Sequence, residues 1–136
     1  MRASILRRVP LWVWWIPVVV GVSLPIFGFT FQPQWSRVHV VPFSDPEDKP
    51  RDTLLNIAMF IPFGYLFARG RRMPRALAGA MVAAALLSAG AEATQLFSTE
   101  RNPSGTDVSM AVAGAAAGSV LRSWLKRLKG QAERSR

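Results

Sequence analysis

The chain has 136 residues, of which 50% are hydrophobic, and a net charge of +9; this length suits one domain. Because it contains no cysteine and a single histidine, His39, disulfides, thiol nucleophiles, zinc–thiolate sites and multi-histidine metal sites are excluded. The positive charge raises nucleic acid as a partner, but the basic clusters lack the interleaved aromatic residues of single-strand binders. We therefore expect no nucleic-acid partner, no metal and no cofactor.

The first predicted element is a transmembrane helix over residues 11–30, which follows a basic N-terminus at residues 1–10. A signal peptide has an apolar region of about 7–15 residues followed by a small-residue cleavage site. The apolar stretch in this chain is longer, and no clear site of that kind follows it. The pattern therefore predicts a retained membrane anchor.

Three further segments have the length and composition of membrane spans. A bilayer core of about 30 Å is crossed by about 20 mostly apolar helical residues, and these segments are residues 52–68, 76–97 and 107–125. Between and after the spans lie an outer loop at 31–51, a basic loop at 69–75, an outer loop at 98–106 and a basic tail at 126–136. The sequence therefore predicts an all-α, polytopic integral membrane protein with four transmembrane helices.

The distribution of lysine and arginine predicts the orientation of these helices. Thirteen basic residues fall in the N-terminus, the basic loop and the tail with Arg122 just before it, whereas four fall in the two outer loops. Because cytoplasmic segments carry the excess of Lys and Arg, we expect both termini in the cytoplasm of a multi-pass protein of the cell inner (plasma) membrane. Most of the positive charge is then a topology signal, with added attraction to anionic lipid.

With this orientation, six polar residues share one layer near the outer surface, and we call them the outer polar cluster. The cluster consists of Asp52, Asn56, Glu92, Gln95, Arg101 and Asp107. Asp52 and Asn56 are four residues apart, and Glu92 and Gln95 are three apart, so each pair shares a helix face. We predict a binding site in this layer.

Each member of the cluster also has a structural interpretation. Asp52 and Asp107 suit the capping of helix N-termini, Asn56 and Gln95 suit hydrogen bonds between helices, and Arg101 suits a solvated loop. Glu92 is harder to explain in this way, because a lone carboxylate in a span costs about 2.5–3.5 kcal/mol. We expect a pair with Arg101 or a raised pKa to offset that cost.

Small residues and a proline predict how the helices pack. Gly114 and Gly118 form a GxxxG pattern, which lets two helix backbones approach closely. Pro62 and Gly64 lie in the stretch "PFG" of the second span, where the proline is expected to kink the helix.

A set of motifs extends over about residues 41–120. The motifs are "VPF" at 41–43, "DTLLNIAMFIPFG" at 52–64, "EATQLF" at 92–97, and then Arg101, Asp107, Gly114 and Gly118. In order and spacing this set resembles the VanZ-like membrane protein family. One position departs from the pattern, because an Asn is expected four residues after Asp107 and this chain has Ala111.

The resemblance implies a small bacterial integral membrane protein of the cell envelope. The named member of the family is associated with low-level resistance to teicoplanin-type glycopeptide antibiotics, and no established reaction comes with the family. Antibiotic resistance is therefore what the resemblance implies for a relative, and for this chain it is a hypothesis.

Three functions follow as hypotheses. The first is a non-enzymatic envelope protein whose outer polar cluster binds a lipid headgroup, a lipid-linked cell-wall precursor or another membrane protein. The second is a membrane hydrolase or transferase acting on a lipid-linked substrate, with Glu92 as general acid or base. The third is a transporter, which with four spans and no internal repeat requires an oligomer. The first is preferred.

Overall fold

The protein is built from helices. A computed structural model of the chain describes residues 9–23, 28–46 and 50–135, and this part contains no strand, although two isolated bridges join extended segments. In chain order the elements are the 3-10 helix η1 (Leu11–Trp15), α2 (Ile16–Ser23), the 3-10 helix η2 (Trp35–Arg37), α3 (Pro50–Phe67), α4 (Arg75–Gln95) and α5 (Gly105–Arg134). The predicted all-α class is confirmed.

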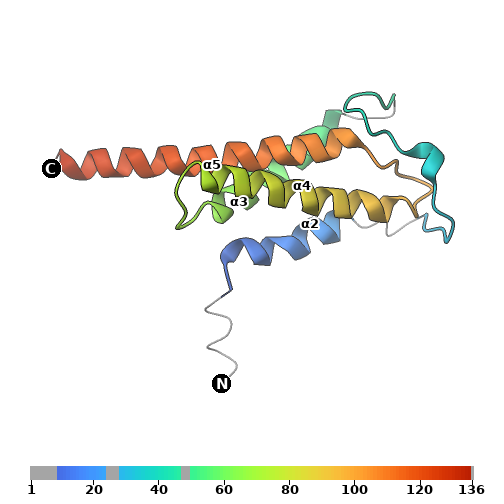
Figure 1. The fold of residues 1–136 in the computed structure, drawn as a ribbon, viewed down its shortest axis with the longest axis horizontal. Coiled ribbons are helices and arrows are strands. Elements are labelled where there is room, and N and C mark those ends of the chain that lie inside the picture. Colours follow the sequence, from blue (N-terminus) through green and yellow to red (C-terminus); the bar gives the residue numbers. More distant parts are fainter. Residues whose placement is uncertain (1–8, 24–27, 47–49, 136) are drawn as a thin grey trace, which may run out of the picture.

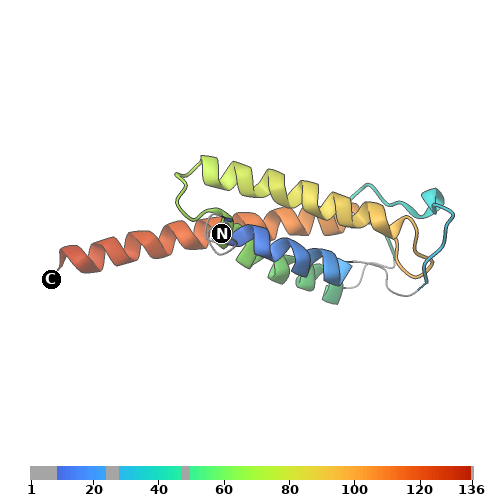
Figure 2. The same ribbon diagram turned by 90° about the horizontal axis from the view of Figure 1, so that it is seen from below.

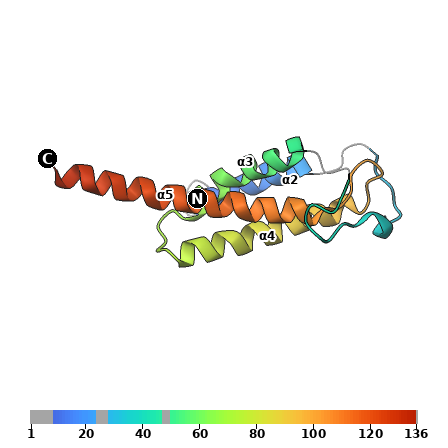
Figure 3. The ribbon, with the colours of Figure 1, turned by 90° about the horizontal axis from the view of Figure 1, so that it is seen from above.

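The helices form an elongated bundle with two different ends (Figures 1 and 2). The segments 28–46 and 96–104 lie together at one end, which we call the loop end. At the other end, residues 68–74 connect α3 to α4, and we call it the basic end because this connection carries three arginines. α5 continues past the basic end (Figure 3).

α3 and α5 make the closest helix pair, because glycines remove the side chains between them. An ideal Cβ on Gly64 would overlap the carbonyl oxygen of Ala115, and one on Gly114 would lie 2.6 Å from the carbonyl oxygen of Ile57. Ser119 adds a polar link, since its Oγ donates to the carbonyl oxygen of Gly64 at 3.2 Å. The GxxxG segment thus lies directly against the backbone of α3.

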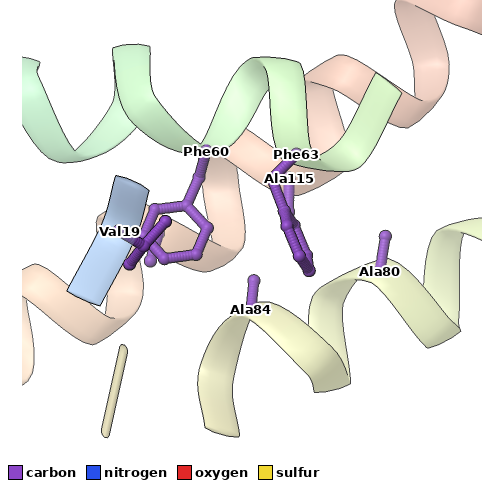
Figure 4. Close-up of a cluster of buried hydrophobic side chains, with 7 residues drawn as sticks. Val19, Phe60, Phe63, Ala80, Ala84 and Ala115 are labelled. Carbon is purple, nitrogen blue, oxygen red and sulfur yellow. The ribbon is translucent and has the colours of Figure 1, made fainter. Parts of the chain in front are cut away.

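The core between the helices pairs two large rings with small side chains (Figure 4). Phe60 and Phe63 of α3 are each 1% exposed and pack edge to face, with their ring centroids 5.7 Å apart. They meet alanines of α4 and α5 and the buried Val19 of α2. At the level of Phe63, Trp15 Nε1 donates to the carbonyl oxygen of Met59 at 2.8 Å, which ties η1 to α3.

Two helices, α4 and α5, are long and apolar enough to cross a membrane. The apolar helix over residues 11–22 is shorter. α3 has 18 residues, but Arg51 and Asp52 lie in its first turn, so its apolar part is shorter than the helix. The bundle also exposes large apolar side chains along its length, such as Leu54, Leu86 and Val120, which suits a lipid-facing surface.

The helix bounds differ from the sequence prediction at both ends of the chain. α5 continues to Arg134, so most of the expected tail at 126–136 belongs to the last helix. Residues 11–15 form a 3-10 helix, because Pro17 has no N–H to donate to Val13 and Ile16 donates to that carbonyl instead. Residues 1–8 and 24–27, which include parts of the expected N-terminus and first span, lie outside the described residues.

Candidate functional site

Glu92 lies in the last turn of α4 and is 9% exposed. Its Oε1 accepts a hydrogen bond from Nε2 of Gln95 at 3.1 Å, and its Oε2 accepts one from the backbone N–H of Ser104 at 2.9 Å. The expected ion pair with Arg101 is not formed among the described residues. Hydrogen bonds to a carboxylate are charge-assisted and stronger than neutral ones, so these two donors offset the cost of burial in place of Arg101.

Ser104 connects Glu92 to the start of α5. It is the N-cap residue of that helix, and its Oγ accepts from the N–H of Thr106 at 3.1 Å. The next residue, Gly105, donates its N–H to the carbonyl oxygen of His39 at 2.7 Å. A side chain at this position is excluded, because a Cβ would overlap the carbonyl oxygen of Val40. The end of α4, the start of α5 and the segment 28–46, which we call the first loop, therefore meet at one point.

We predict that Ser104→Ala lowers the free energy of unfolding by about 1 kcal/mol, because a side-chain cap of that size is lost. Unfolding of the detergent-solubilised protein by denaturant measures the change. Ser109→Ala is the control, since its Oγ bonds only to the carbonyl oxygen of Gly105 one turn earlier, and it is expected to change stability by less than half as much. Equal effects of the two substitutions would contradict a capping role.

The first loop is fastened over this region by a second group of polar contacts. Oδ2 of Asp45 accepts from Nδ2 of Asn102 at 3.2 Å and lies 3.9 Å from Nε2 of His39. Asp45 is only 8% exposed. Nearby, the N–H of Phe43 donates to Oγ1 of Thr106 at 2.7 Å. The loop therefore packs on the segment that precedes α5.

Two neighbouring cavities open at the loop end, and four residues line both of them. The shared residues are Asp52, Gln95, Arg101 and Asp107. The larger cavity, of about 580 Å³, is otherwise lined mainly by polar residues of the two loops, including Asp45, Glu100, Asn102 and Ser104. The smaller cavity, of about 290 Å³, is lined on its other side by apolar residues of α2 and α3: Val18, Val22, Leu55, Ala58 and Met59.

All six residues of the outer polar cluster line the smaller cavity, where Asn56 and Glu92 join the four shared residues. Asp52 and Asp107 are each the third residue of their helix, so they lie in the first turn, and the N-cap of α5 is Ser104 instead. Carboxylates in that turn interact favourably with the helix dipole. The structure thus brings the cluster together at one cavity.

Arg101 is half-buried between the two cavities. Its backbone N–H donates to Oγ of Ser98 at 3.2 Å, which fixes the backbone, while its guanidinium makes no hydrogen bond or ion pair with the described residues. The donors of the guanidinium are therefore available to an anion in the cavity.

The described part of the chain shows no group of three or more His, Cys, Asp or Glu side chains placed to hold a metal ion. What the cavities offer is carboxylates, amides and one guanidinium. These groups bind phosphates, amines and hydroxyls by hydrogen bonds and charge.

The sequence model of a family described as VanZ/LLP1 matches residues 11–126. The chain belongs to this family. The resemblance inferred from residues 41–120 is confirmed, and the match also includes the first apolar helix. No curated protein and no solved structure matches the chain.

The structure explains one departure of this VanZ/LLP1 protein from the expected family pattern. Ala111, where an Asn is expected from the family resemblance, is 0% exposed and belongs to the hydrophobic core with Phe60 and Ala84. An unpaired buried amide at this position costs free energy, so the alanine suits its surroundings. The α5 residue that lines both loop-end cavities is Asp107, one turn before Ala111.

Sequence reasoning missed several residues that shape the cavity of this VanZ/LLP1 protein. Ser104 has a sequence signal, because Ser-x-x-Asp at 104–107 resembles a capping box at a helix start. Asp45 and Asn102 carry no such signal, since they are brought together across 57 residues by the folding of two loops.

Proposed function

We propose that the chain is a multi-pass protein of the bacterial inner membrane, with four spans and both termini in the cytoplasm. α4 and α5 have the length and apolarity of spans. η1 with α2, and α3, lie alongside them in the same bundle (Figure 1). The thirteen basic residues of the N-terminus, the 69–75 loop and the tail with Arg122 just before it support a cytoplasmic basic end.

In this orientation the loop end faces outward, and its two cavities form a site for an amphiphilic ligand. The observation that carries this proposal is the set of four residues shared by a polar and a half-apolar cavity. A headgroup in the larger cavity and the start of an apolar chain against Val22 and Met59 would occupy both cavities at once. A lipid, or a lipid-linked cell-wall precursor, has this division between polar and apolar parts.

The residues of the outer polar cluster have different roles in binding the ligand. Arg101 contacts a phosphate of the headgroup, because its donors are not used elsewhere. Asp52 and Asp107 contact hydroxyl or amine groups and balance the charge of Arg101. Glu92 holds the site in shape through Gln95 and Ser104. That use of both carboxylate oxygens favours a binding protein over a hydrolase in which Glu92 transfers protons.

We predict that Arg101→Gln weakens the binding of a polyprenyl phosphate about tenfold or more, because one charge-assisted contact is lost. The affinity is measured with the protein in phosphatidylcholine nanodiscs. The matched control is Arg51→Gln, which removes a cation of the first turn of α3 that is exposed and lines neither cavity. Equal affinities for the two variants would exclude Arg101 as the phosphate contact.

Deletion of the gene tests the role in the envelope. A strain that lacks the protein is expected to change its susceptibility to teicoplanin-type glycopeptides or its content of lipid-linked precursors, and complementation with the Arg51→Gln variant restores the original state. If the Arg101→Gln variant complements the deletion as well as the wild-type gene does, the result counts against the site.

A further inference from the structure

A second cavity with a different chemistry lies at the basic end. It has a volume of about 560 Å³ and is formed by the 68–74 connection, the start of α4 and the middle of α5. Four cations line it, namely Arg71, Arg72, Arg122 and Lys126. The rest of the lining is small or apolar apart from two hydroxyl groups, those of Ser119 and Ser123.

No acidic residue lines this cavity. In addition, none of its four cations forms an ion pair with any residue that the structure describes. Four positive charges that face one space repel each other, and an anion in that space would relieve the repulsion. The cavity therefore has the charge of an anion site, whereas carboxylates line both cavities at the loop end.

Two of the cations are held in place by aromatic rings. The guanidinium carbon of Arg71 lies 4.2 Å from the ring centroid of Phe67, and that of Arg122 lies 4.9 Å from the ring centroid of Tyr65. Arg71 also donates through Nη1 to the carbonyl oxygen of Phe67. A guanidinium stacked on a ring keeps donors free at its edge. The rings thus restrict the guanidinium groups without neutralising them.

With the orientation proposed above, the position along α5 puts this cavity near the cytoplasmic surface of the membrane. Arg122 follows Asp107 of the loop-end cavities by 15 residues, which is about 22 Å along a helix, and no charged residue lies between them. A bilayer core is about 30 Å thick and is bounded by headgroup layers. The 68–74 connection and the middle of α5 lie beside each other at this level (Figure 1).

We propose that the cavity of Arg71, Arg72, Arg122 and Lys126 binds a phosphate group, supplied by the headgroup of an anionic phospholipid in the cytoplasmic leaflet. Arginine donors fit phosphate oxygens in pairs, and basic cavities between helices on the cytoplasmic side suit anionic headgroups. Ala68, Met73 and Ala76 provide an apolar wall for the glycerol end of the lipid. This site is separate from the loop-end site: it rests on the membrane orientation proposed above, and not on the ligand proposed there.

The competing explanation is that these cations are only part of the general positive charge that orients the protein. The chain offers matched residues that separate the two explanations. Arg127 and Lys129 lie on the same helix as Arg122 and Lys126, are exposed, and do not line the cavity. General attraction to anionic lipid depends on the number of charges, so it treats the two pairs alike.

The test compares R122Q/K126Q with R127Q/K129Q, each of which removes two charges. Native mass spectrometry counts the phosphatidylglycerol molecules retained by each detergent-purified variant, with phosphatidylcholine as the neutral reference. We expect the affinity for phosphatidylglycerol to fall about tenfold or more for R122Q/K126Q relative to R127Q/K129Q, because only the first variant removes charge-assisted contacts to a phosphate in the cavity. Equal losses in the two variants overturn the proposal.

A second pair keeps the test valid if R122Q/K126Q does not fold. Arg72→Gln removes one cavity cation from the exposed connection, and Arg69→Gln removes an exposed arginine nearby that does not line the cavity. We expect a loss of affinity of about fivefold for Arg72→Gln relative to Arg69→Gln, because only Arg72 can contact a phosphate in the cavity. Equal affinities for these two variants also overturn the proposal.

Competition identifies the source of the phosphate. Millimolar inorganic phosphate or glycerol 3-phosphate is added to the protein with bound phosphatidylglycerol. If either displaces the lipid from the wild type and this effect is lost in R122Q/K126Q, the site is supported with a soluble phosphate as its occupant. Retention of the lipid under the same conditions supports the headgroup. Because Arg101→Gln leaves this cavity intact, it is expected to keep wild-type phosphatidylglycerol binding, which separates failure at one site from failure at the other.

Discussion

Glu92→Ala is expected to lower the free energy of unfolding by about 2–4 kcal/mol, because the buried N–H of Ser104 and the amide of Gln95 both lose their acceptor. Each of these donors now bonds to one oxygen of the carboxylate, at 2.9 Å and 3.1 Å. The loss also loosens the start of α5, since Ser104 is its N-cap. Denaturant unfolding in detergent and the abundance of the protein in membranes measure the effect.

Glu92→Gln is the informative partner of this substitution. The carbonyl oxygen of a glutamine can accept from the N–H of Ser104, and Gln95 can turn its own carbonyl oxygen toward the new amide group. We therefore expect a loss of about 1 kcal/mol or less, with near-normal abundance. Glu100→Ala, which truncates an exposed carboxylate in the segment 96–104 that follows α4, is expected to leave the free energy of unfolding unchanged.

The two Glu92 variants also separate the proposed binding role from the alternative of hydrolysis or transfer. A general acid or base is lost in both variants, so a reaction that needs it stops in both while the glutamine protein stays folded. A holding role predicts that Glu92→Gln retains ligand binding and complements a gene deletion. Loss of function in a fully folded Glu92→Gln protein would overturn the holding role.

The features predicted correctly from the sequence are those that depend on whole segments. Hydropathy extends over a helix, so α4 and α5 were predicted within a few residues except at the end of α5. The charge of Glu92 in an apolar segment marked it as a residue that needs partners, and the spacing of Asp52, Glu92 and Asp107 placed them in one layer. The structure brings these three residues to one cavity.

The features that were missed depend on contacts between distant segments or on the backbone. A pair with Arg101 or a raised pKa was expected to offset the burial of Glu92. One of its carboxylate oxygens accepts instead from the backbone N–H of Ser104, which any residue at position 104 other than proline would supply. The burial of Asp45 depends on a loop that folds over the start of α5. The basic cavity could not be predicted from the number of basic residues. Arg69 and Arg72 lie in the same basic loop, and only Arg72 lines the cavity.

Gly118→Ala is expected to have the largest effect on the fold. An ideal Cβ at this position would overlap the carbonyl oxygen of Ile61 and lie 2.8 Å from the backbone nitrogen of Tyr65. These atoms belong to the helix backbone of α3 and cannot turn away as a side chain does, so the two helices must separate. We expect a loss of about 3 kcal/mol or more in the free energy of unfolding, measured in detergent, together with reduced abundance in membranes.

Gly130→Ala on the same helix is the matched control, because nothing lies within 4 Å of a Cβ there. Alanine is a better helix former than glycine, so this variant is expected to gain about 0.5–1 kcal/mol. Helix propensity alone predicts a gain in stability for both substitutions. Close packing predicts a loss for Gly118→Ala and a gain for Gly130→Ala. A Gly118→Ala protein as stable as the wild type would show that α3 and α5 do not meet at Gly118, and with that the link from Ser119 to Gly64 would also fail.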